Sequence, residues 1–121
     1  MNMAILVAAL IQVESGGNCN AVGDGGNSVG CLQIQVAVIQ DVNRIYGRHY
    51  LPSDRHNKRK SEEICRLYLM HYGKNYERKT GKKATPEVLS RCWNGGPMGW
   101  RKSATVKYWE KVKREMRKGA K

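Results

Sequence analysis

The residues best suited to carry chemistry lie in one stretch, VESGGNCNAVGDGGNSVGCLQI, which covers residues 13–34. Within it, Glu14 follows an apolar run and precedes a loop rich in Gly and Asn. The chain holds 22 Lys and Arg, yet none of them precedes Arg44. A carboxyl group packed against apolar neighbours without a cation has a raised pKa and can act as a general acid. Cleavage of a glycosidic bond needs such an acid, so the sequence predicts a proton donor at Glu14.

A purely structural role is the alternative at both acidic positions of this stretch. Glu14 could be an exposed residue at a helix end, with Gly16 and Gly17 ending the helix. Asp24, in GDGGN, is either an ordinary turn residue or a second carboxylate that holds or deprotonates a water opposite Glu14. The loop has neither the alternating oxygen ligands of a calcium loop nor the Gly-Lys-Ser/Thr of a phosphate loop.

The stretch CWNGGPMGW, residues 92–100, is a second candidate for ligand contacts. Asn94 and the backbone beside it could donate hydrogen bonds to a sugar. Trp93 or Trp100 could offer a flat apolar wall to a sugar ring. Alternatively, Trp93 belongs to the core and Asn94 ends a helix. Aromatic and basic residues together can also bind single-stranded nucleic acid, which keeps that class open.

The cysteines and histidines give no sign of a metal site. The four cysteines have no C-x-x-C spacing and the histidines show no ligand spacing, so we expect no metal and no cofactor. Apolar neighbours favour free thiols used as small hydrophobic residues. The even count also permits one or two disulfides in an exported protein, with no pairing assigned. The four are Cys19, Cys31, Cys65 and Cys92.

Length and charge limit the possible classes. A chain of 121 residues is expected to form a single domain, 1–121, that buries its own core. The net charge of +12 implies an anionic partner such as nucleic acid, acidic lipid or an acidic polymer. No apolar run approaches the roughly 20 residues of a membrane span. The start, MNMAILVAALIQVES, lacks the basic residues of a signal peptide and is interpreted as the first core helix.

The elements that must position these residues are predicted to be helices, because no run alternates with period two. Ile34, Val38, Val42 and Ile45 recur at steps of three or four and mark one helical face. Ser61 is a predicted helix cap, followed by Glu62 and Glu63 in the first turn. Thr85 and Pro86 form a second typical helix start, and Gly95 and Gly96 a typical stop. These signals predict a mainly α fold of about five helices, the last of which has a basic face. The expected helices cover residues 1–15, 31–46, 61–76, 85–94 and 106–118, with 47–60 as loop.

Three motifs, taken in order, resemble the lysozyme-like superfamily, in particular lytic transglycosylases and goose-type lysozymes. The resemblance spans residues 4–110. It implies a small lysozyme-like helical domain around a substrate cleft. The motifs are Glu-Ser at a helix end (Glu14, Ser15), Gly-x-x-Gln-apolar (Gly30, Gln33, Ile34) and an aromatic–Asn pair (Trp93, Asn94).

This resemblance implies a muramidase that cleaves the β-1,4 bond between N-acetylmuramic acid and N-acetylglucosamine, with Glu14 as proton donor. Asp24 matches the first further acid of goose-type lysozymes, whereas Gln35 replaces the second. Trp93 stands where the transglycosylases usually have Tyr. The alternative is a lytic transglycosylase that forms 1,6-anhydro products. The residues expected to bind substrate are Ser15, Gln33, Gln35, Trp93 and Asn94.

The expected partner is therefore the glycan strand of peptidoglycan, whose peptide carboxylates suit a +12 protein. A monomer that binds no nucleic acid is expected. It would be a bacteriolytic hydrolase of the cell wall, acting in the periplasm, outside the cell or from a phage, although no signal peptide is visible. Another class also stays open, a non-catalytic wall-binding or virion structural protein on the same fold.

Overall fold

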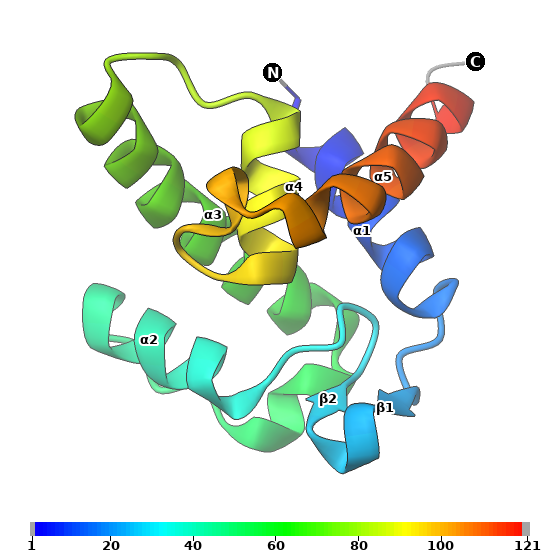
Figure 1. The fold of residues 1–121 in the computed structure, drawn as a ribbon. Coiled ribbons are helices and arrows are strands. Elements are labelled where there is room, and N and C mark those ends of the chain that lie inside the picture. The colour runs from blue at the N-terminus through cyan, green and yellow to red at the C-terminus, as the bar shows by residue number, and fades with distance from the viewer. Residues whose placement is uncertain (1, 120–121) are drawn as a thin grey trace. The chain divides into compact units, whose positions relative to one another are not determined.

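The computed structural model describes residues 2–119, which form a mainly α-helical structure (Figure 1). A short antiparallel hairpin, β1 (Val22–Gly23) and β2 (Ser28–Val29), follows the first helix. The mainly α class and the five helices are thus confirmed, whereas the hairpin was not expected, because two-residue strands leave no alternation to detect. The substrate cleft stays a prediction. The helices are α1 (Met3–Ser15), α2 (Val36–Tyr46), α3 (Lys58–Thr80), α4 (Pro86–Gly95) and α5 (Val106–Gly119).

Contacts group the chain into two compact units, and the boundaries fall within α1 and α3. Unit 1 comprises Met1–Val13 and Leu69–Lys121, and unit 2 comprises Glu14–Tyr68. The expected single domain over residues 1–121 stays a prediction. Among residues 2–119, no helix is both long enough and apolar enough to cross a membrane.

Unit 1 is built on helix signals that can be read locally. The Asn2 side chain accepts hydrogen bonds from two backbone N–H groups in the first turn of α1. Thr85 caps α4 by accepting from the Val88 N–H at 3.2 Å, Pro86 follows it, and Gly96 ends the helix, as predicted. The core of this unit buries Leu6, Leu10, Leu69, Leu89 and Val112.

Unit 2 departs from the predicted helix boundaries at two places. The expected helix over 31–46 begins only at Val36, because Gly30 and Gln33 adopt positive φ and Ile34 pairs with Val29 through two backbone hydrogen bonds. The expected helix from residue 61 begins at Lys58 instead. Ser61 is therefore not a cap. It is fully buried and donates to a backbone carbonyl.

The segment 47–60, expected to be loop, contains a short helix, η2 (Pro52–His56), and its last three residues already belong to α3. Pro52 begins η2, and the Asp54 carboxylate accepts from the Leu51 N–H at 2.8 Å, which closes its first turn. Asn43 of α2 holds the preceding residues by exchanging two hydrogen bonds with the backbone of Tyr50. This segment lies in unit 2 and contacts the hairpin, as described below.

Candidate functional site

A disulfide between Cys19 and Cys31 ties the loop after α1 to the end of the hairpin. The preference for free thiols was wrong for this pair, because spacing alone does not show which cysteines the fold brings together. It is confirmed for Cys65 and Cys92, which are buried and unlinked. A structural disulfide is typical of proteins in the periplasm or outside the cell.

Glu14 lies in the last turn of α1 and is half-buried. Burial raises the pKa of the Cys65 thiol well above its ordinary value, and the negative charges of Glu14 and Glu62 raise it further. The Glu14 carboxylate therefore lies within electrostatic reach of the Cys65 thiol, and its predicted role as a proton donor stays a prediction. The Cys65 thiol stays protonated at neutral pH and is not a nucleophile.

Ser15 and Gln33, both expected to bind substrate, make hydrogen bonds inside unit 2. The Ser15 hydroxyl donates to the Cys31 carbonyl at 2.7 Å and accepts from the Gly17 N–H at 3.2 Å. The Gln33 amide donates to the carbonyls of Ala21 at 3.1 Å and Gly30 at 3.0 Å. Both side chains thus hold the hairpin in place, a task that the sequence did not suggest.

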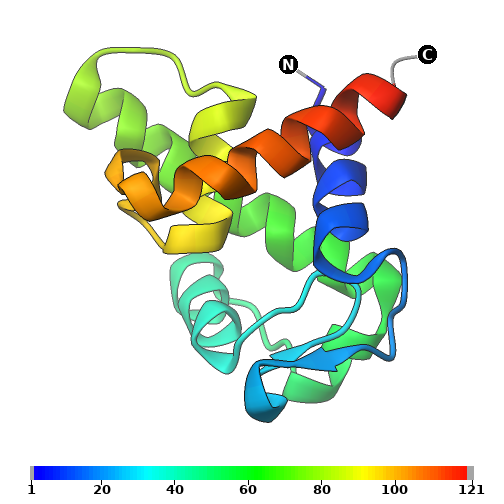
Figure 2. The same cartoon turned by 45° about the vertical axis from the view of Figure 1, so that its right-hand side comes forward.

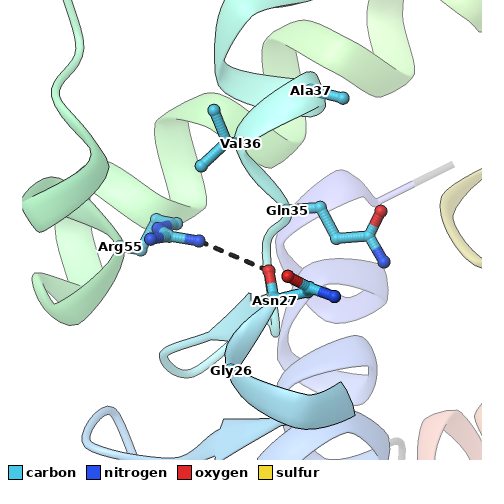
Figure 3. A pocket seen from close by; sticks show the side chains of 6 residues that line it. All are labelled: Gly26, Asn27, Gln35, Val36, Ala37 and Arg55. Atoms are coloured by element: carbon cyan, nitrogen blue, oxygen red, sulfur yellow. Dashed lines mark hydrogen bonds between the residues drawn. The ribbon is translucent and has the colours of Figure 1, made fainter.

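Asp24 and Gln35 come together at the exposed edge of the hairpin. The Gln35 amide donates to the Asp24 carboxylate at 3.3 Å, and both residues are exposed. Gln35 also faces an open pocket between the hairpin and the start of α2 (Figure 3). The lining residues are Gly26, Asn27, Gln35, Val36, Ala37 and Arg55.

Trp93 and Asn94 lie in the last turn of α4 and belong to unit 1. Trp93 is half-buried and Asn94 is exposed. Their role in binding stays a prediction. Trp100 packs edge-to-face against Tyr76, with ring centroids 5.0 Å apart, and Arg101 lies over its ring. One face of Trp100 is therefore covered within this unit.

Arg55 and His56 are the residues of unit 2 that sequence reasoning missed. The Arg55 guanidinium donates to the carbonyls of Pro52 at 2.8 Å, Ile34 at 3.0 Å and Asn27 at 3.5 Å (Figure 3). His56 Nδ1 lies 3.0 Å from the Cys19 carbonyl oxygen. No sequence signal could have found the contacts with Ile34, Asn27 and Cys19, because these partners are backbone carbonyls far along the chain.

Asp54 should make the stability of this region depend on acid. The Leu51 N–H, and then Lys60, hold the pKa of Asp54 below its usual range. This contribution to stability is complete above about pH 4, near the ordinary Asp pKa, and is lost as the pH falls through the lower pKa of the folded state. Asp54→Asn should therefore lower stability by about 0.5–1 kcal/mol at pH 7. Urea unfolding of both proteins should show the difference narrowing from pH 5 toward pH 2. A difference in the free energy of unfolding between the two proteins that does not change with pH would contradict this account.

Comparisons with known proteins give a structural match but no sequence match. No protein-family model and no curated protein sequence matches this chain. Among solved structures, a chain in the crystal structure of Aeromonas hydrophila PliI in complex with Meretrix lusoria lysozyme superposes with a TM-score of 0.74 and 26% identity. The match covers 91% of this chain and 87% of that chain. That crystal structure contains two proteins, and the comparison identifies the complex rather than which of its two chains matches.

This finding corrects the family resemblance. No family model supports the goose-type lysozymes or the lytic transglycosylases, and the structural match is to a chain of the complex of PliI with a lysozyme. The physical reason is visible in unit 2. Gly30 and Gln33, which carried the second motif, serve the backbone geometry of the hairpin, and Ser15 bonds to Cys31. These residues therefore have a structural explanation that needs no substrate cleft.

The functional assignment that rested on the resemblance is withdrawn with it. A peptidoglycan-cleaving glycosidase, whether muramidase or transglycosylase, and a glycan strand as partner are replaced by what the match describes, which is an association between two proteins. The same correction applies to the wall-binding and virion alternatives, whereas the expected monomer stays a prediction. The roles of Glu14 and Asp24 stay predictions.

Proposed function

We propose that the protein works by binding another protein, as one member of a complex of the kind that PliI forms with a lysozyme. The observation that carries this proposal is the structural match to a chain of that complex over 91% of this sequence. The disulfide supports a place of action outside the cytoplasm, in the periplasm or beyond, because such bonds persist in oxidising compartments.

The surface that supports this function best is the hairpin edge of unit 2. Val22 is 61% exposed, and Asp24, Asn27 and Gln35 add exposed polar groups around the open pocket. Such a mixture of one apolar and several polar side chains suits a protein interface. The pocket is a place where a partner side chain could be received.

The backbone of the hairpin edge is fixed by a disulfide and by side-chain hydrogen bonds. The disulfide, the Gln33 amide and the Arg55 guanidinium fix the backbone that carries Asp24. A binding surface that is ordered before association loses less conformational entropy on binding, which favours affinity. In this proposal Asp24 and Gln35 contact the partner, whereas Ser15 and Gln33 position them.

The test titrates the purified protein separately with Aeromonas hydrophila PliI and with Meretrix lusoria lysozyme. Saturable binding to PliI would assign this chain the place of the lysozyme, and binding to the lysozyme would assign it the place of PliI. Binding to neither would contradict the proposal. Asp24→Lys should weaken the complex about tenfold or more, whereas a charge reversal of opposite sign at an exposed site of unit 1, Lys82→Glu, should leave it unchanged.

A second readout keeps binding and chemistry separate. The same preparations are assayed for release of soluble fragments from purified peptidoglycan and for any effect on lysis by the lysozyme. Wild-type protein and Glu14→Gln are compared, because the substitution preserves shape while removing a titratable proton. Binding that is identical in the two proteins would show that Glu14 lies outside the protein interface, whatever the lysis assay gives.

A further inference from the structure

The excess of positive charge is concentrated in unit 1. This unit carries 15 of the 22 Lys and Arg but only 4 of the 10 Asp and Glu, whereas unit 2 carries 7 and 6. A protein partner for the hairpin edge would therefore bind the nearly balanced unit. The strongly basic unit has no role in the proposed function, and its charge calls for a separate explanation.

The densest part of this charge is the exposed face of α5. Six Lys and Arg and only two Glu occupy the 14 residues of the helix. The side chains that repeat at steps of three or four residues lie on one face, which we call the basic face, and all of them are exposed. The opposite face is anchored in the core by Val112, which is fully buried. The basic face consists of Lys107, Lys111, Arg114 and Lys118.

An apolar groove adjoins the C-terminal end of the basic face. Its floor comes from small residues of α1 together with Ile5, which is 39% exposed. Both views of the fold show the first half of α1 beside the last turns of α5 (Figures 1 and 2). Lys118 belongs to both the basic face and the groove, where it pairs with Glu115 at 2.9 Å. The groove is lined by Ala4, Ile5, Ala8, Ala9, Gln12, Glu115, Lys118 and Gly119.

From these two features we infer that unit 1 docks on an anionic membrane surface through the basic face of α5, with the groove against α1 receiving an acyl chain. Peripheral membrane binding combines attraction between cations and acidic lipids with burial of apolar surface beside them. The basic face supplies the cations that attract acidic lipids. Ile5 and the alanines of the groove supply the apolar surface that is buried.

The groove is what favours a lipid over other polyanions. Single-stranded nucleic acid is held by cations together with aromatic rings on which bases stack. The aromatic residues of α5, Tyr108 and Trp109, are half-buried rather than presented with the lysines. A lipid has the matching chemistry, because its charged headgroup and its apolar chain suit neighbouring basic and apolar surfaces.

The first experiment measures co-sedimentation with vesicles of phosphatidylcholine alone and of phosphatidylcholine with phosphatidylglycerol in equal parts. Binding is expected only to the anionic vesicles. The test variant changes Lys107, Lys111 and Lys118 to Gln, and the matched control changes Lys74, Lys82 and Lys83, which are also exposed lysines of unit 1. Each lysine near an anionic surface raises the affinity of a protein for the membrane roughly fivefold. The affinity of the test variant for anionic vesicles should therefore fall about 100-fold, and that of the control variant only a few-fold.

Equal losses in the two triple variants would overturn the docking surface, because they would show a response to net charge alone. Binding of a DNA oligonucleotide without binding of anionic vesicles would also overturn it. The groove is tested by Ile5→Gln, which should remove the binding that survives at high salt, where charge attraction is screened. If Ile5→Gln binds vesicles at high salt as well as the wild type does, the groove is excluded as an acyl-chain site. All of these outcomes are independent of the titrations with PliI and lysozyme.

Discussion

Replacement of Gly30 by alanine should destabilise the protein by about 3–5 kcal/mol, combining overpacking with an unfavourable backbone conformation. Gly30 has φ of +88°, and a Cβ atom there would lie 1.8 Å from the Arg55 carbonyl oxygen. That oxygen belongs to the backbone of η2, so a rotamer change cannot relieve the clash. Either the hairpin or η2 must move, and the contacts that join them would be lost.

A control separates the clash from the backbone conformation. Gly25 also has positive φ, +64°, but a Cβ atom there would meet nothing within 4 Å. Gly25→Ala should therefore lose only about 1–2 kcal/mol, which is the conformational penalty alone. Chemical unfolding, followed by circular dichroism, measures both variants. If Gly30→Ala and Gly25→Ala lower the free energy of unfolding equally, η2 can shift at little cost and the close approach at Gly30 does not matter for stability.

The sequence was most informative where structure depends on neighbouring residues. The start of α4 at Thr85 and Pro86 and its end at Gly96 were confirmed, because caps act within a few residues. The exposed basic face predicted for the last helix was confirmed, because helical periodicity is also local.

The sequence failed where distant segments decide the conformation. The start of α2 was placed too early, because the turn before it is set by Gly30, which must clear the backbone of Arg55 far along the chain. The same holds for the disulfide. Nothing in the spacing of four cysteines distinguishes the pair Cys19–Cys31 from the alternatives until the hairpin is known.

The candidate site shows why a motif is weaker evidence than a geometry. Gln33 fitted a family pattern for a ligand cleft, and its amide turns out to hold the carbonyls of Ala21 and Gly30. Asp24 and Gln35 were singled out separately and lie together at an exposed edge. Residue types alone could not separate a contact with a ligand from support of the hairpin.

Loss of the disulfide between Cys19 and Cys31 should lower the free energy of unfolding by about 2–4 kcal/mol, because the bond restricts the unfolded chain over a loop of this length. The two cysteines are 12 positions apart, and the loop that they close contains the whole β1–β2 turn. Cys65 and Cys92 are unaffected, since they are buried elsewhere and unlinked.

The decisive comparison uses both single variants and the double variant. Cys19→Ser, Cys31→Ser and their combination should all be destabilised to nearly the same extent, because either change alone breaks the bond and two partners of one interaction are not additive. Addition of a dithiol reductant to the wild type should produce the same loss, and should leave the double variant unchanged. Additive single-variant losses, or a wild type indifferent to the reductant, would mean that Cys19 and Cys31 stabilise unit 2 as two separate packed side chains rather than through a bond.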